Sequence, residues 1–329
     1  MFALGPGVEL EARVCLCFEP GRSKLLAMPE LPDITVYVEA LERRIVGESV
    51  LGLRIGSPFV LRTVDPSREA LYGKRVVGVE RIGKRIALRL QDGLAVVMHL
   101  MVSGRLAWKA PGAALPRKTG LFALDFARGT LILVEASTKK RAALHLVRGG
   151  DEGLRAFQRG GVDPRHITVE QWAEALRREN HTLKRALTDP RITDGIGNAY
   201  SDEILHRARL SPLKQTHTLD DKQVRELLHA ARAVLTEWIE RLRAQAGEGF
   251  PAKVTAFRPE MTVHGRFGQA CPQCGTLVQR IRYAENETNY CPRCQTQGRL
   301  LADRSLSRLL KSDWPRSIDE LEELRANLP

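Results

Sequence analysis

The stretch Met28-Pro29-Glu30-Leu31-Pro32-Asp33 organises the rest of the sequence, although it lies well inside the chain. Met28 followed by Pro has the form of a translation start, which would leave Pro29 as a terminal secondary amine beside the Glu30 carboxylate. A free α-amino group has a pKa near ~8, so part of it is nucleophilic at neutral pH. Such an amine can form a Schiff base with a carbonyl carbon while the neighbouring carboxylic acid moves protons. The same residues also fit an ordinary proline-rich turn before a helix, and the rest of the chain decides between the two interpretations.

The composition points to a folded protein with a polyanionic partner. A length of 329 residues fits about two domains, and Lys and Arg outnumber Asp and Glu by 51 to 39. This balance favours nucleic acid first and an anionic membrane surface second. No run of about 18 or more apolar residues occurs, so we expect no membrane-spanning segment. Residues 1–27 lack the apolar core of a secretory signal, and we expect this leader to lie outside the active protein.

A helix followed by β-structure is predicted directly after the opening stretch. Its apolar residues recur on one helical face, at Ile34, Val38, Leu41 and Ile45. Pro32-Asp33 can cap its start, and Gly47 ends it. Short β-rich runs then follow at a spacing of roughly ten residues, at 50–55, 76–81, 86–90, 94–100, 121–126 and 130–134. This pattern predicts a β-sandwich or barrel that ends near residue 150.

Helical patterns replace the β-pattern after Gly149-Gly150. Thr168 and Gln171 have the spacing of a capping box, in which both side chains satisfy backbone N–H groups at a helix start. A long amphipathic helix is predicted after Thr218, and the stretch 247–261 is irregular. Residues 301–329 predict an amphipathic helix, for which a solvated terminal helix is the simplest interpretation. We therefore expect an α+β protein with several domains.

Two Cys-x-x-Cys pairs form the strongest motif. Cys271 and Cys274 make the first pair, Cys291 and Cys294 make the second, and 16 residues separate the pairs. Four thiolates at this spacing suit a closed tetrahedral zinc site, which has no open position for water and is therefore structural. Such pairs also favour a reducing compartment. The residues between them predict an arginine-rich hairpin suited to phosphates, although zinc ribbons also contact proteins.

Three further groups are candidate functional residues. The stretch 194–203 contains two glycines that permit a tight turn, and Asn198 opens a helix whose free N–H groups can hold a phosphate. A glycine-bearing turn with Asn as the helix cap explains the same residues equally well. Lys84 precedes the 86–90 strand, and His99 lies in the 94–100 strand. Each also has an ordinary interpretation, as a solvated lysine and as a structural histidine.

Taken in order, these motifs resemble the formamidopyrimidine-DNA glycosylase and endonuclease VIII family over about residues 28 to 295. The resemblance rests on Pro-Glu-Leu-Pro at 29–32, on Gly-Ile-Gly-Asn at 195–198, and on the four-cysteine finger with Tyr-Cys-Pro-Arg-Cys-Gln at 290–295. It implies a bifunctional DNA glycosylase with abasic-site lyase activity that flips a damaged base out of the duplex. By this resemblance, Pro29 attacks the deoxyribose C1′, Glu30 protonates the sugar ring oxygen, and Lys84 acts near the phosphate.

The same resemblance implies the domain order and the partner. We expect a helix and catalytic β-sandwich over residues 28–150, a helical helix–two-turn–helix domain that binds DNA over 151–262, a zinc finger over 263–298 and a tail over 299–329. DNA contacts are expected from Lys84, His99, Lys139, Lys140, Arg141, Asn198, Arg280 and Arg282. The expected partner is damaged double-stranded DNA and the expected cofactor is one structural zinc ion. We expect a monomer in the bacterial cytoplasm, associated with the nucleoid.

Four departures from the family pattern bear on the activity. Val102 stands where the family has a wedging Met, and the run 136–142 lacks the Phe and Pro of the family's Asp-Pro-Arg-Arg-Phe-Gly segment. Asn286 replaces a finger Arg, which predicts β-elimination over βδ-elimination. The leader is the largest departure, because an amide-bonded Pro29 has no nucleophilic nitrogen. Two alternatives remain open: a catalytically silent lesion-binding protein, and a glycosylase without lyase activity.

Overall fold

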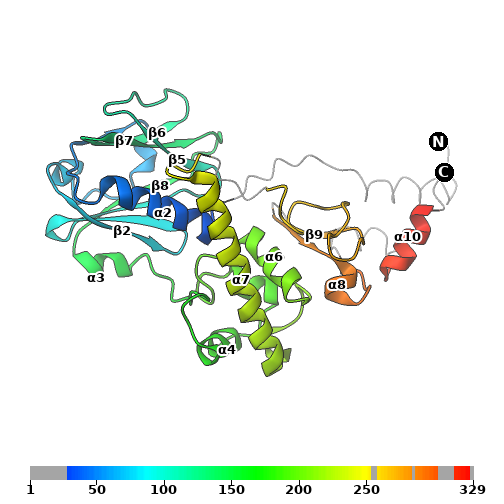
Figure 1. Ribbon diagram of the computed structural model, residues 1–329. Helices are drawn as coiled ribbons and strands as arrows, with labels where there is room; N and C mark the ends of the chain where they lie inside the picture. Colours follow the sequence, from blue (N-terminus) through cyan, green and yellow to red (C-terminus); the bar gives the residue numbers. More distant parts are fainter. Residues whose placement is uncertain (1–27, 253–257, 284–285, 303–314, 327–329) are drawn as a thin grey trace, which may run out of the picture.

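The chain forms a β-sandwich, a helical domain, a four-cysteine hairpin and a short terminal helix, in this order along the molecule (Figure 1). The computed structural model describes residues 28–252, 258–283, 286–302 and 315–326. The expected leader, 1–27, lies outside these described residues. The predicted α+β class is confirmed, because helices and antiparallel sheets occupy separate parts of the chain. Within the described ranges, no helix is long and apolar enough to cross a membrane.

Helix α2 (Leu31–Ile45) links the two largest parts of the fold. At its start the Asp33 carboxylate accepts the Glu30 N–H at 3.0 Å, which satisfies a backbone group that a helix start leaves free. Pro32 fits the first turn, because its missing N–H would have no helical partner there. Leu31 packs in the core of the helical domain, whereas Ile34 packs in the core of the sandwich. One helix therefore contributes to both cores.

Two four-stranded antiparallel sheets make the sandwich, in the orders β1-β6-β7-β5 and β2-β3-β4-β8. The strands are β1 (Gly52–Ile55), β2 (Val76–Ile82), β3 (Arg85–Leu90), β4 (Ala95–His99), β5 (Gly104–Lys109), β6 (Gly120–Phe126), β7 (Gly129–Glu135) and β8 (Ala143–Val147). All the predicted strands are present with shifted bounds. The sequence prediction missed β5 and β8, because their charged or imidazole residues weaken the apolar alternation. These two segments become strands by pairing with β7 and β4, respectively.

Helix α3 (Gly150–Arg155) packs through Leu154 against the β2-β3-β4-β8 sheet. Helices α4 (Val169–Arg177), α5 (Leu183–Thr188), α6 (Asn198–Arg207) and α7 (Asp221–Ala246) make the helical domain. The predicted capping box is confirmed: Thr168 Oγ1 accepts the Gln171 N–H, and the Gln171 side chain accepts the Thr168 N–H. Their shared core contains the fully buried Trp172 and Tyr200. Helix α7 also packs against α2, so it reaches from this domain to the sandwich (Figure 1).

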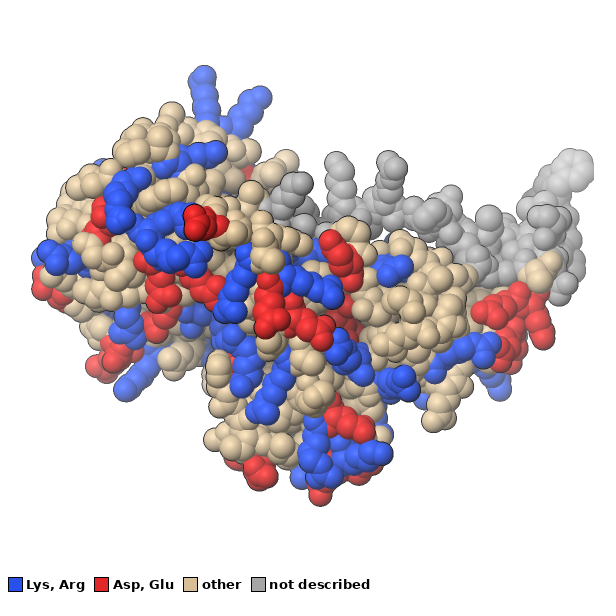
Figure 2. Space-filling view, viewed as in Figure 1, with Lys and Arg blue, Asp and Glu red and all other residues tan. Residues whose placement is uncertain are grey.

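The finger is the predicted hairpin, made of β9 (Gln279–Tyr283) and β10 (Asn286–Tyr290) and followed by α8 (Pro292–Thr296). Of the helix predicted over 301–329, the structure describes α10 (Ile318–Ala326), while 303–314 lies outside the described residues. Helix α10 docks on the finger through Ile318, which packs with Leu300, and through an Arg293–Asp319 ion pair of 2.6 Å. Figure 2 shows its acidic side chains gathered at one end of the molecule.

Arg81 ties the sandwich to the helical domain. It lies on β2, and its guanidinium donates to Asp194 at 2.6 Å and to Asp163 at 2.6 Å. Its side chain is only 13% exposed, so this double ion pair is largely shielded from water. The loop that leads into α6 is thereby held against the sandwich.

We expect Arg81→Met to lower the free energy of unfolding by about 2–3 kcal/mol, because charge-assisted hydrogen bonds contribute roughly 1.5–3 kcal/mol and two carboxylates lose their cation. Urea unfolding followed by circular dichroism measures this. The matched control is Arg89→Met, which removes more exposed pairs with Glu80 and Asp151 on the same sheet and should cost under about 1 kcal/mol. Equal losses in the two variants would contradict the special role of Arg81.

Candidate functional site

The Glu30 carboxylate is buried on the N-terminus of α6. Its Oε2 accepts the N–H of Gly197 at 2.6 Å and that of Tyr200 at 3.3 Å, and its Oε1 accepts the N–H of Ala199 at 2.9 Å. Free N–H groups and the helix dipole favour an anion at this position. The sequence analysis left open whether these N–H groups hold a phosphate or belong to an ordinary glycine turn. In the structure the anion that they bind is the chain's own carboxylate.

Two glycines allow this close approach. A side chain on Gly197 would collide with the Lys84 Nζ and with the Glu30 carboxylate, so both groups pack against its bare α-carbon. Gly195 has a φ of +77°, which residues other than glycine rarely adopt. Burial lowers the pKa of Lys84, and the Glu30 and Asp194 carboxylates oppose that shift. The structure therefore brings Lys84 and Glu30 together at the start of α6.

Asp33 fixes the backbone that precedes α2. Its Oδ2 accepts the Glu30 N–H, and its Oδ1 accepts from the Arg258 guanidinium at 3.1 Å. Burial raises the pKa of Asp33 to about 6, although Arg258 opposes the shift. Pro29 itself is buried. The residue next to the candidate nucleophile thus has both its side chain and its N–H held in place.

His99 lies at the end of β4, opposite Arg85 on β3. Burial lowers the pKa of His99 to about 4, and the charges of Arg85 and Lys84 act in the same direction. The imidazole is therefore neutral at pH 7 and can donate one N–H to a phosphate without carrying a charge. Arg85 supplies a positive charge beside it, over the Phe157 ring.

The loop after β7 is built around a buried carboxylate that the sequence analysis missed. Glu135 accepts the N–H of Arg141 at 3.0 Å and of Ala142 at 3.1 Å, and the Ser103 hydroxyl donates to it at 3.0 Å. Lys140 also donates to the Glu135 carbonyl. Glu135 therefore joins this basic loop to the 100–104 loop, which carries Val102 at the family's wedge position. The Lys139 and Arg141 side chains are exposed.

Helix α6 also carries the contacts to the finger. The Asn198 side chain donates to the Glu287 carbonyl of β10 at 2.8 Å. Asp202 accepts from Lys184, from the His264 ring and from the Asn289 N–H. Glu203 accepts three successive N–H groups, of residues 262, 263 and 264. Asn198 therefore joins α6 to the hairpin. Asp202 and Glu203, which the sequence analysis did not identify, hold the hairpin and the segment before it against α6.

The four cysteines of the finger converge as predicted. The Sγ atoms of Cys271 and Cys294 lie 4.0 Å apart, and that of Cys274 lies 3.4 Å from Cys291 and 3.5 Å from Cys294. Ligands at about 2.3 Å from a tetrahedral zinc ion are roughly 3.8 Å from one another. These soft donors at these separations fit one structural zinc ion. His206, at the end of α6, lies beside them with its pKa lowered to about 4, first by burial and then by Arg209 and Arg207.

Arg280 and Arg282 lie on β9, so the predicted basic hairpin is present. The Arg280 guanidinium lies 4.1 Å from the centre of the Phe267 ring and 3.7 Å from the Glu287 carboxylate. Arg282 is exposed. The arginines of the finger are therefore partly neutralised by acids of the same protein, as Arg293 is by α10.

The pKa of His99 predicts a pH dependence of stability. Between about pH 6.5 and 4, His99 is protonated in the unfolded chain but neutral in the folded protein, so stability falls as the pH decreases. The wild-type protein should lose free energy of unfolding between pH 7 and pH 5. We expect His99→Gln to make this loss smaller by up to about 2 kcal/mol. Urea unfolding at both pH values measures it. His229→Gln, on the exposed side of α7, should leave the loss unchanged; no difference between the two variants would refute the buried neutral state.

Three family models match successive parts of this chain. They are the formamidopyrimidine-DNA glycosylase N-terminal domain at residues 28–144, the formamidopyrimidine-DNA glycosylase H2TH domain at 161–247, and the zinc finger found in FPG and IleRS at 268–297. Curated relatives agree. The formamidopyrimidine-DNA glycosylase of Mycobacterium bovis (strain BCG / Pasteur 1173P2) is 30% identical over 304 residues, which cover 83% of this chain and 100% of the relative. The formamidopyrimidine-DNA glycosylase of Pelotomaculum thermopropionicum is 29% identical, and the match covers 82% of this chain and 99% of the relative.

Solved structures have the same fold. Formamidopyrimidine-DNA glycosylase of Lactococcus lactis, non-covalently bound to DNA that contains an abasic site, superposes with a TM-score of 0.70 at 26% identity and covers 81% of this chain and 99% of that one. A MutM complex with DNA that contains carbocyclic 8-oxo-G superposes with a TM-score of 0.71 at 26% identity. The match covers 82% of this chain and 100% of that chain. The chain therefore belongs to the formamidopyrimidine-DNA glycosylase family, whose members are base-excision-repair glycosylases with abasic-site lyase activity.

Proposed function

We propose that this chain removes a damaged, oxidised base from double-stranded DNA and then nicks the abasic strand by β-elimination. The observation that carries the proposal is the buried Glu30 carboxylate, fixed on α6 beside Lys84 and directly after Pro29. An acid next to an amine nucleophile is the pair that Schiff-base chemistry at a sugar requires. A silent lesion-binding protein and a glycosylase without lyase activity are the alternatives that borohydride trapping and gel analysis separate.

In the proposed reaction the Pro29 nitrogen attacks C1′ of the flipped nucleotide and loses its proton. The bond from C1′ to the base breaks, and the base leaves with the electron pair and takes up a proton. Glu30 protonates the ring oxygen, so the sugar opens and the Pro29 lone pair forms an iminium bond to C1′. The iminium group acidifies C2′, and loss of a C2′ proton expels the 3′ phosphate oxygen. Water then hydrolyses the iminium and frees Pro29.

This chemistry requires Pro29 to be the first residue of the active protein. In a Met28-Pro29 peptide bond the nitrogen lone pair is delocalised into the amide and cannot attack carbon. The match to the family's N-terminal domain begins at residue 28, which supports an active form without residues 1–28. We propose that translation from Met28 or cleavage of the leader produces it.

The DNA strand would lie across both domains and the finger. In this proposal Lys84 and Asn198 contact the strand at the start of α6, and His99 contacts it from the end of β4. Lys139, Lys140 and Arg141 contact it from the loop held by Glu135. Arg280 and Arg282 extend the contact to the hairpin. One chain supplies every proposed group, so we propose a monomer. The reducing conditions that free cysteines need and the bacterial sources of the relatives support a location in the bacterial cytoplasm, on the nucleoid.

Borohydride trapping tests the nucleophile, because only a Schiff base is reduced to a stable covalent adduct. The protein that starts at Met28, with its Met removed, should be trapped on abasic duplex DNA, and the uncut chain 1–329 should not be. Without borohydride, gel analysis should show mostly 3′ unsaturated aldehyde, as expected from Asn286. Equal trapping of both forms would move the nucleophile elsewhere, with Lys84 the first candidate. Trapping of neither form would favour the silent lesion-binding alternative.

Glu135 provides a second test, on loop positioning. We expect Glu135→Ala to slow base excision by about 10- to 100-fold, because misplacement by about 1 Å can cost that much. The affinity for abasic duplex should fall by a smaller factor, because the positive charges of the loop remain in the variant. Single-turnover excision and fluorescence anisotropy measure the two effects. Glu135→Gln keeps one of the two acceptor oxygens, so it should restore part of the rate. The exposed Glu152→Ala is the matched control. Equal losses of affinity and rate would contradict the positioning role, because Glu135 would then act through DNA binding alone.

A further inference from the structure

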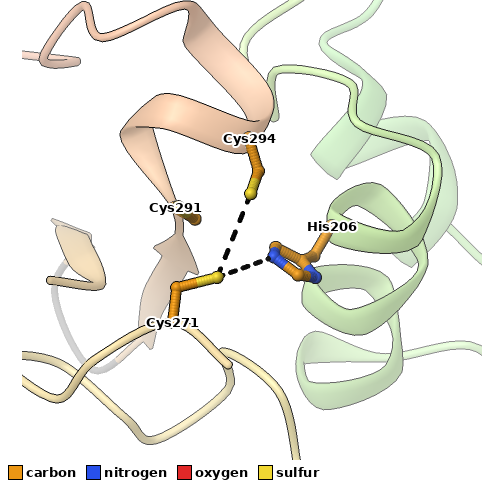
Figure 3. A group of neighbouring side chains, drawn as sticks. All are labelled: His206, Cys271, Cys291 and Cys294. Atoms are coloured by element: carbon orange, nitrogen blue, oxygen red, sulfur yellow. Dashed lines mark hydrogen bonds between the residues drawn. The ribbon is translucent and has the colours of Figure 1, made fainter. Parts of the chain in front are cut away.

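A histidine of the helical domain lies at the metal centre of the finger. His206 belongs to the last turn of α6 and is 1% exposed. Its Nε2 lies 3.4 Å from the Sγ of Cys271, toward which the ring points (Figure 3). The Nε2 and the sulfurs of Cys271, Cys291 and Cys294 all lie within 4.8 Å of one another. The metal position is therefore approached from two parts of the fold.

Cys274 is the outlying member of the cysteine set. Its sulfur is close to those of Cys291 and Cys294, yet it does not belong to the group of four mutually close donors. It is also exposed, whereas Cys271 and Cys291 are buried. Two sets of four donors thus share three sulfurs. Cys274 completes one set and His206 completes the other.

The second set has the chemistry and the dimensions of a zinc site. Three cysteines and one histidine are a common structural ligand set for zinc. With zinc–sulfur bonds of about 2.3 Å and zinc–nitrogen bonds of about 2.0–2.1 Å, a tetrahedral site places sulfur and nitrogen roughly 3.5 Å apart. The separation between Cys271 and His206 is 3.4 Å. The imidazole therefore needs little movement to become a ligand.

We propose that His206 is an alternative fourth ligand of the centre and binds the zinc ion in place of Cys274. The three shared sulfurs hold the ion in both arrangements, so that loss of the exposed Cys274 thiolate leaves the metal in place. In the second arrangement the ion bonds directly to α6, the helix whose other end holds Glu30. This property of the metal centre does not depend on the proposed glycosylase chemistry.

The competing explanation of the same geometry is an Nε2–H···S hydrogen bond. In that arrangement all four cysteines bind zinc permanently, and His206 only donates a hydrogen bond to the Cys271 thiolate. The two explanations predict different metal sites once Cys274 is removed. A hydrogen-bonding histidine then leaves three ligands and an open position, whereas an alternative ligand closes the site.

The test compares four variants of the full chain: Cys274→Ala, Cys291→Ala, His206→Phe and the double variant Cys274→Ala/His206→Phe. Zinc per chain is measured by plasma mass spectrometry after dialysis against a mild chelator, and the ligands are identified by X-ray absorption at the zinc edge. Cys274→Ala should keep about one zinc ion, with three sulfurs and one nitrogen. Cys291→Ala, which removes a shared sulfur, and the double variant should both lose the metal.

His206→Phe alone should keep about one zinc ion with four sulfurs, which verifies that this substitution leaves the finger folded. Loss of zinc from Cys274→Ala, to the level of Cys291→Ala, would overturn the proposal in favour of the hydrogen bond. Retention of zinc by the double variant would also overturn it, because water would then be the fourth ligand.

Discussion

The contact between the Glu30 carboxylate and the N-terminus of α6 is the interaction on which the rest of the site depends. A buried carboxylate loses its hydration, and that loss is tolerable only where several donors replace the water. Here three N–H groups at a helix start do so, and the helix dipole adds to them. Because Glu30 precedes α2, which packs in both cores, the contact also helps to join the sandwich to the helical domain.

Helix α6 connects the Glu30 contact to the finger and to the cysteine cluster. Its first turn holds Glu30, its middle holds the finger through Asp202 and Glu203, and its last turn places His206 at the cysteines. All these polar groups are buried, so each would be costly if it lost its partner. The Glu30 carboxylate and the cysteine cluster are consequently fixed relative to one another by one ten-residue helix. The hairpin is held against α6 by the same contacts.

The excess of positive charge does not by itself identify the surface that binds DNA. Lys and Arg interleave with Asp and Glu across the face in Figure 2, and many arginines pair with acids. Arg81 and Arg293 are structural in this sense, whereas Lys139 and Arg141 project from a loop that the buried Glu135 shapes. Which cations remain available is decided by which carboxylates fold against them. The net charge of +12 alone predicts a polyanionic partner and no more.

The sequence by itself determined the features that depend on nearby residues: the helix after Glu30, the capping box at Thr168, most strands and the four-cysteine site. These rest on periodicity or on hydrogen bonds between residues a few positions apart, which a linear pattern displays. Only the tertiary structure decided that the N–H groups of α6 bind Glu30, which is 167 residues from Gly197. It likewise decided that Glu135 binds the loop after β7, that the β5 and β8 segments form strands, and that His206 lies beside the cysteines. Such contacts join distant segments, so their partners are set by packing and by the need to satisfy buried polar groups, which no local pattern records.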